Sequence, residues 1–550
     1  MLGIARRNGM KGMSGRRGRV VVAVFAVLFG AFRVGAAIPP GAVLVVYDSR
    51  VEGSVEVAEH YAGSASVPGG LGTVAGARPG VRAFDLATSG VPIPGGSDGT
   101  ISGAVFRDAI RDPIRAYLLA EGLDGQTRVL VLCRGVPHRV RDFDNASAGD
   151  GPGPLVNEFN GADADASSVD SQLTLLWQDL GDSEAGGVRD SFADNYIANP
   201  YHGRTEPITS FSNADNRAPK SFGFDLLFGL IVSGDGPGPS DLGPGDLLMV
   251  CRLDGTTVTD AKRLIDRGRR VIIDTDTARF VLDESGSNGA ADAGFNAELD
   301  NLGFGSTPDP LRLGDDYETA RDLLLADGRF PAANVLYNAA GGGSEYLRGP
   351  VPAFAGGETV DGPVLLLAHY SENHAGKPAG SDSSLRLVGT FGFANLARGA
   401  IFNTLESFNG RAFNGLGTSF NQEQAADFIA AGGAFAVGTV YEPLGNTVAD
   451  NEMLVRNFIV GERTWAEAAW SAVPALSWMH VVLGDPLATI ERGAFDVNGD
   501  GRADIEDAYA IAEQPSDTDG DGDADRDDVE FLIDFLRQGE IEDMTRGRRR

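Results

Sequence analysis

The sequence predicts an α/β protein with a mostly parallel, doubly wound sheet, followed by a small all-α module that binds calcium. Two observations lead to this prediction. Short apolar runs alternate with amphipathic helical segments over most of the chain, and two acidic twelve-residue segments stand near its end. Continuous apolar runs are typical of strands buried on both faces of a parallel sheet. Their alternation with helices indicates helical crossovers between the strands.

The predicted strands are runs of three to six apolar residues, most of them bounded by Gly, Pro, Asp or Asn. They lie at 43–47, 129–133, 247–251, 271–273, 335–337, 364–368, 400–402 and 435–440. The predicted helices cover 54–61, 105–120, 169–180, 258–266, 317–325, 422–431 and 464–470. The chain has 550 residues, 42% of them hydrophobic, so it is long enough to form a large core and more than one domain.

The first 37 residues differ from the rest. They hold seven basic residues and no acidic one, then an apolar run at 20–32, then small residues at 35–37. This order is typical of a secretory signal peptide, so we expect a secreted or extracytoplasmic protein. A run of 13 residues is shorter than the ~20 that span a bilayer, although an uncleaved signal anchor is the alternative. No other stretch predicts a membrane span.

The charge balance bears on the partners. The chain has 46 basic and 77 acidic residues, and loss of the seven basic residues with the signal peptide leaves 39 against 77, a net charge of −38. Such a charge argues against nucleic acid and anionic membranes as partners, and it is compatible with calcium. The two cysteines, Cys133 and Cys251, are too few for a disulfide-dense scaffold, and a single disulfide between them stays open.

The expected domain boundaries follow changes in composition. We place the α/β domain at 38–494, with a loop-rich insertion at 141–245 that is dense in Gly, Asp, Pro and Ser. The calcium module is expected at 495–540, and a basic tail at 541–550.

The two acidic segments, 496–507 and 517–528, read DVNGDGRADIED and DTDGDGDADRDD. Each has oxygen-bearing side chains at loop positions 1, 3, 5, 9 and 12, with Gly at position 6, which is a calcium-loop pattern with Asp at position 12. Gly501 and Gly522 permit the sharp turn that such a loop needs. Without a cation the carboxylates repel one another, so the metal is expected to order the loop.

The pattern predicts two Ca²⁺ ions. The predicted side-chain ligands are Asp496, Asn498, Asp500 and Asp507 in the first loop, and Asp517, Asp519, Asp521 and Asp528 in the second. The carbonyls of Arg502 and Asp523 are expected at position 7, and Asp504 and Asp525 are expected to act through water.

An amphipathic helical pattern follows each loop. Over 495–539 the paired units resemble a type I dockerin, which implies binding to a cohesin domain and attachment to a scaffold or surface. The positions similar to the partner-contact pairs of that family are Ile505 with Glu506, and Arg526 with Asp527; they depart from its usual small hydroxyl residues. The alternatives are a solvated acidic tail and a calcium module that only stiffens the C-terminus.

The large domain resembles an uncharacterised family of exported bacterial proteins from genomes with exosortase-type sorting, which implies an architecture and no activity. The matching segments are 54–61, 134–137, 168–171, 252–255, 399–410, 438–443 and 484–487. Its second half is also similar to the caspase-like fold of gingipain-type cysteine peptidases, so we expect a caspase-like or Rossmann-like sheet. In that resemblance a strand ends at the catalytic His369, and the strand at 399–404 leads to the nucleophile.

No cysteine stands near Glu406 or Ser407, and a thiol is far more nucleophilic than an unactivated hydroxyl, so cysteine-peptidase activity is not expected. Three readings stay open. Ser407 activated by His369 would give a serine-type hydrolase; His369, His374 and a carboxylate such as Glu442 would bind a metal; or the domain is a binding or structural one. We expect an attachment protein without conventional catalysis. The alternative is an extracellular hydrolase, serine-type or part of polysaccharide catabolism.

Overall fold

The computed structural model describes most of the α/β region and of the C-terminal module. The described residues are 38–70, 72–94, 99–141, 166–178, 197–208, 242–283, 317–338, 347–352, 357–369, 391–413, 423–441, 443, 447–500 and 502–547. The predicted signal peptide, most of the insertion at 141–245, His374 and Glu442 lie outside these residues.

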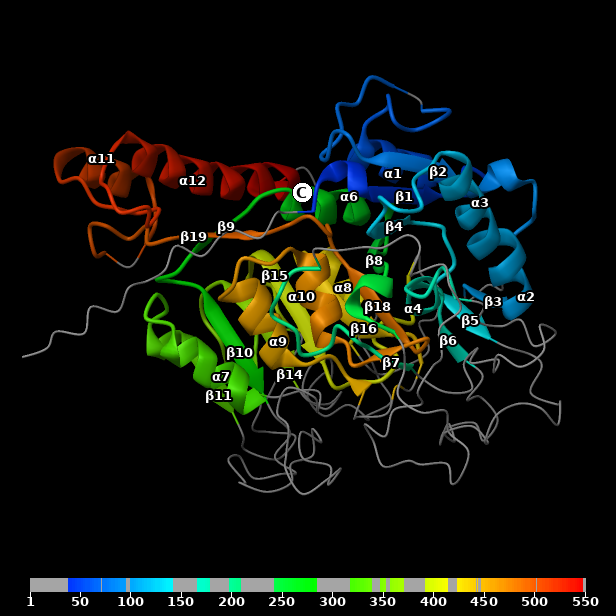
Figure 1. The fold of residues 1–550 in the computed structure, drawn as a ribbon. Coiled ribbons are helices and arrows are strands. Elements are labelled where there is room, and N and C mark those ends of the chain that lie inside the picture. The colour runs from blue at the N-terminus through cyan, green and yellow to red at the C-terminus, as the bar shows by residue number, and fades with distance from the viewer. Residues whose placement is uncertain are drawn as a thin grey trace, which may run out of the picture. The chain divides into compact units, whose positions relative to one another are not determined.

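A ten-stranded sheet forms the centre of the α/β domain, in the order β11-β10-β14-β15-β16-β18-β8-β4-β1-β2 (Figure 1). All neighbouring strands are parallel except β16 and β18, so the predicted mostly parallel sheet is confirmed. The strands are β1 Val43–Tyr47, β2 Arg82–Asp85, β4 Val129–Cys133, β8 Met249–Leu253, β10 Arg279–Asp283, β11 Val335–Asn338, β14 Val364–His369, β15 Leu396–Thr404, β16 Phe435–Thr439 and β18 His480–Leu483.

Shorter strands lie outside this sheet. They are β3 Thr100–Ser102, β5 Arg139–Arg141 and β6 Ala166–Ser168 in one small sheet, then the pairs β7 Ile197–Ala198 with β17 Ala475–Leu476, β12 Leu347–Arg348 with β13 Glu358–Thr359, and β9 Val271–Asp274 with β19 Ile490–Gly493. The predicted strand at 271–273 is therefore a strand, but among the described strands it pairs with β19 alone and not within the large sheet.

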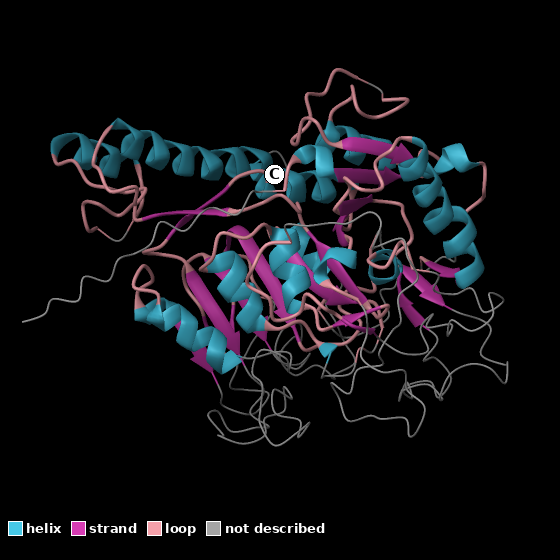
Figure 2. Cartoon of the chain, in the orientation of Figure 1, coloured by secondary structure: helices cyan, strands magenta, loops and turns pink. Residues whose placement is uncertain are grey.

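Figure 2 shows the described helices, and most of them overlap a segment with a predicted helical pattern. They are α1 Ser54–Ala62, α2 Gly103–Phe106, α3 Asp112–Ala120, α4 Val169–Leu173, α6 Val258–Gly268, α7 Tyr317–Ala326, α8 Ala425–Ala431, α9 Asn451–Leu454, α10 Trp465–Ala472, α11 Ile505–Glu513 and α12 Arg526–Gly547. A π-helical turn at Arg107–Arg111 joins α2 to α3, and α4 ends seven residues before the predicted end of its helix. Among the described helices, none has both the length and the apolar character required to cross a bilayer.

Helix α6 shows how the sequence specifies an element. The hydroxyl of Thr257 accepts a hydrogen bond from the amide of Asp260 over 3.1 Å, which caps the first turn. Ala261, Leu264 and Ile265 follow at helical spacing and are buried. Helices α1, α6 and α8 contact one another in series, and α7, α9 and α10 form a second series. The central strands between them are fully buried, as continuous apolar runs predict.

A buried ion pair joins segments that are far apart in the sequence. Arg252 and Asp170 are both 0% exposed, and Arg252 Nη2 lies 2.6 Å from Asp170 Oδ2. The same guanidinium donates to the carbonyl oxygens of Val136 and Pro137 over 2.7 and 3.0 Å. Three of the family-like segments, 134–137, 168–171 and 252–255, thus meet around one arginine.

The segment 484–487 has a similar structural role. Asp485 is buried, and its carboxylate accepts hydrogen bonds from the Tyr61 hydroxyl over 2.8 Å and from Arg78 Nε over 2.6 Å. Because Tyr61 belongs to α1 and Asp485 follows β18, this contact ties the end of the domain to its beginning.

Replacing Asp170 with Asn is expected to destabilise the protein by about 3 kcal/mol, since it leaves the buried Arg252 charge without its main partner. Urea unfolding of the full chain would measure the loss. The matched control is Asp108→Asn, which removes the exposed partner of Arg107 and should cost less than about 1 kcal/mol. Equal losses in the two variants would contradict the role given to the buried pair.

Candidate functional site

The two acidic loops have the same internal hydrogen bonds at matching positions. In both, the amide of position 5 donates to the side chain of position 3, and the amide of position 7 donates to the side chain of position 5. The pairs, donor first, are Asp500–Asn498 and Arg502–Asp500 in the first loop and Asp521–Asp519 and Asp523–Asp521 in the second, at 2.9 to 3.1 Å. Each loop is therefore bent around its own side-chain oxygens.

The position-12 aspartates, Asp507 and Asp528, close both loops. Their Oδ1 atoms accept from the position-3 amides over 3.0 and 3.2 Å, and their Oδ2 atoms accept from the position-9 amides over 2.8 and 2.7 Å. Burial alone would raise the pKa of Asp528, but hydrogen bonds from the amides of Asp525, Thr518 and Asp519 lower it overall. These hydrogen bonds favour the ionised form of Asp528, which is the form that binds a cation.

Glycines make the turns. Gly522, at position 6, has φ 102°, a conformation that side-chain-bearing residues rarely adopt, as the sequence predicts for this position. Its counterpart Gly501 lies outside the described residues. Position 4 has the same requirement, because Gly499 and Gly520 have φ 75° and 76°, and the sequence-based interpretation did not include these two.

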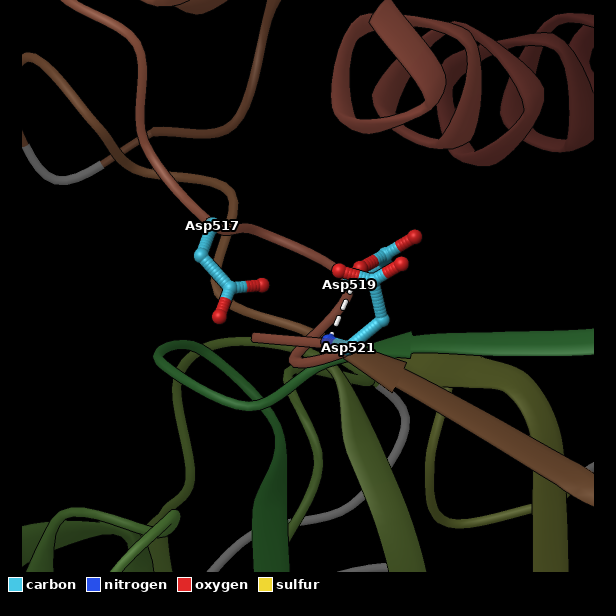
Figure 3. A group of neighbouring side chains, drawn as sticks. All are labelled: Asp517, Asp519 and Asp521. Atoms are coloured by element: carbon cyan, nitrogen blue, oxygen red, sulfur yellow. Dashed lines mark hydrogen bonds between the residues drawn. The ribbon is translucent and has the colours of Figure 1, made fainter. Parts of the chain in front are cut away.

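Three carboxylates of the second loop lie near one another, those of Asp519 and Asp521 side by side and that of Asp517 a little apart (Figure 3). Asp517, Asp519 and Asp521 each offer an oxygen atom, and these atoms lie within 4.8 Å of one another. Across the described part of the chain, no other trio of His, Cys, Asp and Glu brings its donor atoms so close. The two oxygens of Asp517 also accept from the amides of Gly520 and Gly522, which fixes that side chain.

The charges of the second loop oppose one another in the absence of a cation. Partial burial raises the pKa of Asp519, and the neighbouring carboxylates of Asp521, Asp528 and Asp517 add to the rise. The negative charge of Asp521 is the main cause that raises the pKa of the exposed Asp523. A calcium ion prefers hard oxygen donors, and its charge would relieve the repulsion among these carboxylates. The residues of the second loop therefore fit the predicted Ca²⁺ ion.

A second cluster lies at the carboxyl edge of the parallel strands β10, β14 and β15. His369 ends β14 and stands in register with Asp283 on β10 and Thr404 on β15. His369 Nε2 lies 2.8 Å from Glu423 Oε2, and both side chains are almost fully buried. At this distance the imidazole and the carboxylate form an ion pair, although Nε2 and Oε2 do not meet the angular criteria of a hydrogen bond.

Two further carboxylates complete this cluster. Glu406, in the turn after β15, accepts the backbone amide of Glu423 at its Oε2 over 2.9 Å. Burial would lower the pKa of His369, but the charge of Glu423, with smaller contributions from Glu406 and Asp283, raises it to about 9. Burial raises the pKa of Asp283 to about 6, against hydrogen bonds from Leu347 and Asn338. The imidazole is therefore a cation at neutral pH.

Ser407 lies in the same turn as Glu406 but is not hydrogen-bonded to His369. Within the described residues, Nδ1 of His369 has no hydrogen-bond partner, and Nε2 faces Glu423. The pairing of His369 with Ser407 that a serine-type hydrolase requires is thus not formed. The sequence-based interpretation missed Glu423, which stands within the predicted helix 422–431, and Glu406, which directly precedes the serine that it selected.

The remaining candidate side chains are structural. Cys133 and Cys251 are free thiols, and burial raises the pKa of both. A protonated, buried thiol is a poor nucleophile. Burial lowers the pKa of His480 to about 4, and its Nε2 lies 2.6 Å from the carbonyl oxygen of Thr447, so this imidazole is neutral and fixed.

No protein-family model matches this chain, and neither any curated protein nor any solved structure matches it. A functional assignment therefore rests on the sequence and on the geometry of the two clusters.

Replacing Glu423 with Gln is expected to lower the pKa of His369 from about 9 to near or below its ordinary value, because burial is then opposed only by more distant carboxylates. Histidine resonances followed by NMR over pH 4 to 10 would measure this. His480, with a pKa of about 4, is the internal control and should not move. An unchanged His369 titration would contradict the ion pair.

The same shift makes stability depend on pH. The folded pKa of His369, about 9, exceeds the unfolded value of 6.5, so the stabilisation is complete below pH 6.5 and is lost as the pH rises to 9. A shift of this size corresponds to roughly 3 kcal/mol. Urea unfolding of wild type and Glu423→Gln at both ends of this window should show the loss only in wild type.

Proposed function

We propose that this chain is an exported calcium-binding protein whose dockerin-like C-terminal module attaches the α/β domain to a partner on a scaffold or surface. The observation that carries the proposal is the shared hydrogen-bond scheme of the two loops, including the converging carboxylates of Asp517, Asp519 and Asp521. A solvated acidic tail has no reason to repeat five side-chain-to-amide hydrogen bonds at matching positions. The fifth is the amide of position 11 donating to the position-9 side chain, over 2.8 Å from Glu506 to Asp504 and 2.7 Å from Asp527 to Asp525.

The second loop is expected to bind Ca²⁺ more tightly than the first. It has carboxylates at positions 1, 3, 5, 7, 9 and 12, whereas the first loop has Asn498 at position 3 and Arg502 at position 7. The number of charged ligands is one of the factors that set calcium affinity. Each helix begins at position 10 of its loop, at Ile505 and Arg526, so an ion held by the loop would also fix the start of the helix.

The first repeat offers a surface for a partner such as a cohesin-type domain. Ile505 is 55% and Tyr509 69% exposed, the largest values among the large hydrophobic side chains of the described residues. Four residues apart on α11, they lie on one face. The matching positions of α12 are Arg526 and Glu530, which form an exposed ion pair at 2.9 Å. The two repeats thus present an apolar face and a charged face, and we assign partner contact to the apolar one.

The α/β domain is proposed to be what the module carries. A hydrolytic role would have to use His369 with Glu423 and Glu406 rather than Ser407, because these are the groups that the fold brings together. Cysteine-peptidase chemistry has no support, since both thiols are buried within strands.

Isothermal titration of the full chain with Ca²⁺ should show two sites. The double substitution Asp517→Asn with Asp521→Asn should abolish the tighter site and leave the other, because it removes two of the three converging carboxylates. Asp527→Asn, in the same loop at position 11, is the matched control and should retain both sites. Absence of heat in wild type, with circular dichroism unchanged by a chelator, would contradict the proposal.

Binding to cohesin-type domains should require Ca²⁺ and Tyr509. Truncating an exposed aromatic anchor at the centre of an interface typically costs ~2 kcal/mol, so Tyr509→Ser should weaken binding roughly thirtyfold. Biolayer interferometry against a panel of cohesin-type domains, with and without a chelator, would measure it. Glu530→Ser, on the charged face of α12, is the control. Equal weakening by the two substitutions would contradict the assignment of the apolar face.

A further inference from the structure

The C-terminal module shares its apolar core with the α/β domain. Alternate residues of a strand point to opposite faces, and β9 uses both of its faces. Val271 and Ile273 belong to the main core, whereas Ile272, which is 1% exposed, packs in the core of the module with Leu532 and Ile511. The side chain of one strand residue of the α/β domain therefore helps to fill the module.

Phe495 is the second shared residue. It follows β19, directly precedes the first acidic loop, and is fully buried. Its ring stacks on Phe535 of α12 with centroids 4.6 Å apart and lies 5.2 Å from the ring of Phe531. The chain thus enters the first loop from a residue that α12 covers.

Polar contacts also join the α/β domain to the C-terminal module. Arg270, which precedes β9, lies 2.8 Å from Glu491 on β19 and 2.5 Å from Asp534 on α12. The backbone amide of Ala494 donates to the carbonyl oxygen of Thr518, inside the second loop, over 3.2 Å. The edge formed by β9 and β19 is therefore bound both by α12 and by the loop that precedes it.

The second loop and α12 are continuous. Asp528 is the position-12 residue of the loop and also stands in the first turn of α12, and it accepts the amide of Thr518 over 2.5 Å. Phe531, Leu532 and Phe535 follow at helical spacing and form the face that covers Phe495 and Ile272. The residue that closes the loop therefore also belongs to the first turn of the covering helix.

We infer that calcium binding by the second loop and the docking of α12 on the β9–β19 edge are coupled, so that Ca²⁺ stabilises the edge of the α/β domain as well as the module. The inference rests on the proposed calcium function. Without a cation, repulsion among the loop carboxylates loosens the first turn of α12 and its cover over Ile272 and Phe495. Because coupling between two equilibria is reciprocal, docking must strengthen calcium binding by the same factor by which Ca²⁺ strengthens docking, and loss of docking removes that factor.

Two measurements on the full chain test the coupling. One is hydrogen exchange with and without Ca²⁺, and the other is calorimetric titration with Ca²⁺. In wild type, Ca²⁺ should slow amide exchange in β9 and β19 by roughly tenfold, the typical size of such coupling. Ile272→Ser should abolish this slowing and weaken calcium binding by a similar factor, whereas Ile272→Val should keep both. Arg270→Glu, which reverses the charge facing Asp534, is a second test on the surface, with Arg321→Glu on α7 as the matched control.

The possible outcomes distinguish a failure of the proposed coupling from a failure of the proposed calcium function. Calcium heat with unchanged exchange in β9 and β19 would overturn the coupling and leave the calcium function intact. Retained calcium affinity and retained slowing in both Ile272→Ser and Arg270→Glu would also overturn it. No calcium heat in wild type would remove the calcium function and the coupling with it.

Discussion

The large sheet depends on one late strand. Every buried backbone N–H and C=O group needs a partner, and β8 and β16 would each present an unpaired edge if β18 did not lie between them. β18 is antiparallel to β16, with Thr439 opposite His480, and parallel to β8, where Leu483 stands opposite Arg252. The sheet is therefore complete only when residues near the end of the α/β domain are in place. Asp485, two residues after the end of β18, is hydrogen-bonded to Tyr61 of α1 and so holds this end of the domain in place.

The antiparallel pair β16 and β18 also divides the sheet into two parts, and the polar groups at the carboxyl ends of the strands differ between them. On one side of it β8 and its parallel neighbours run one way, and on the other side β14 and its neighbours run the opposite way, so their carboxyl ends face opposite ends of the sheet. Near the end of β8, Arg252 is paired with Asp170 and with backbone carbonyls, which is a structural arrangement. At the end of β14, His369 faces Glu423 and keeps an imidazole nitrogen without a hydrogen-bond partner among the described residues.

The protein balances clustered carboxylates in two ways. In the buried cluster, the repulsion among Glu423, Glu406 and Asp283 is offset within the chain by the protonated imidazole of His369. In the second acidic loop, backbone amides offset part of the repulsion, and oxygen atoms of three carboxylates lie within 4.8 Å of one another near the surface. The buried cluster keeps atoms of His369 and Glu423 without hydrogen-bond partners among the described residues. In the loop, the surface carboxylates repel one another, and the proposed divalent cation would relieve that repulsion.

Much of the fold followed from local pattern. The apolar runs identified most strands of the large sheet, and helical spacing placed α1, α6 and α7 nearly to the residue, because these signals depend on neighbours within a few positions. Strands β2, β10 and β18 of that sheet and most of the short strands outside it were not predicted, and the helix predicted from 169 to 180 ends at Leu173. The position-4 turns of the acidic loops were also missed, although their glycines stand in the pattern.

The sequence by itself determined the acidic loops, since all of their oxygen donors lie within twelve consecutive residues and the backbone geometry between them is local. Only the tertiary structure decided that β9 leaves the large sheet, that Ile272 faces the module, and that His369 pairs with Glu423 instead of Ser407. Those choices depend on which segments become neighbours in space. A single sequence has no local signal for such neighbours, because burial and strand order are properties of the whole packed core.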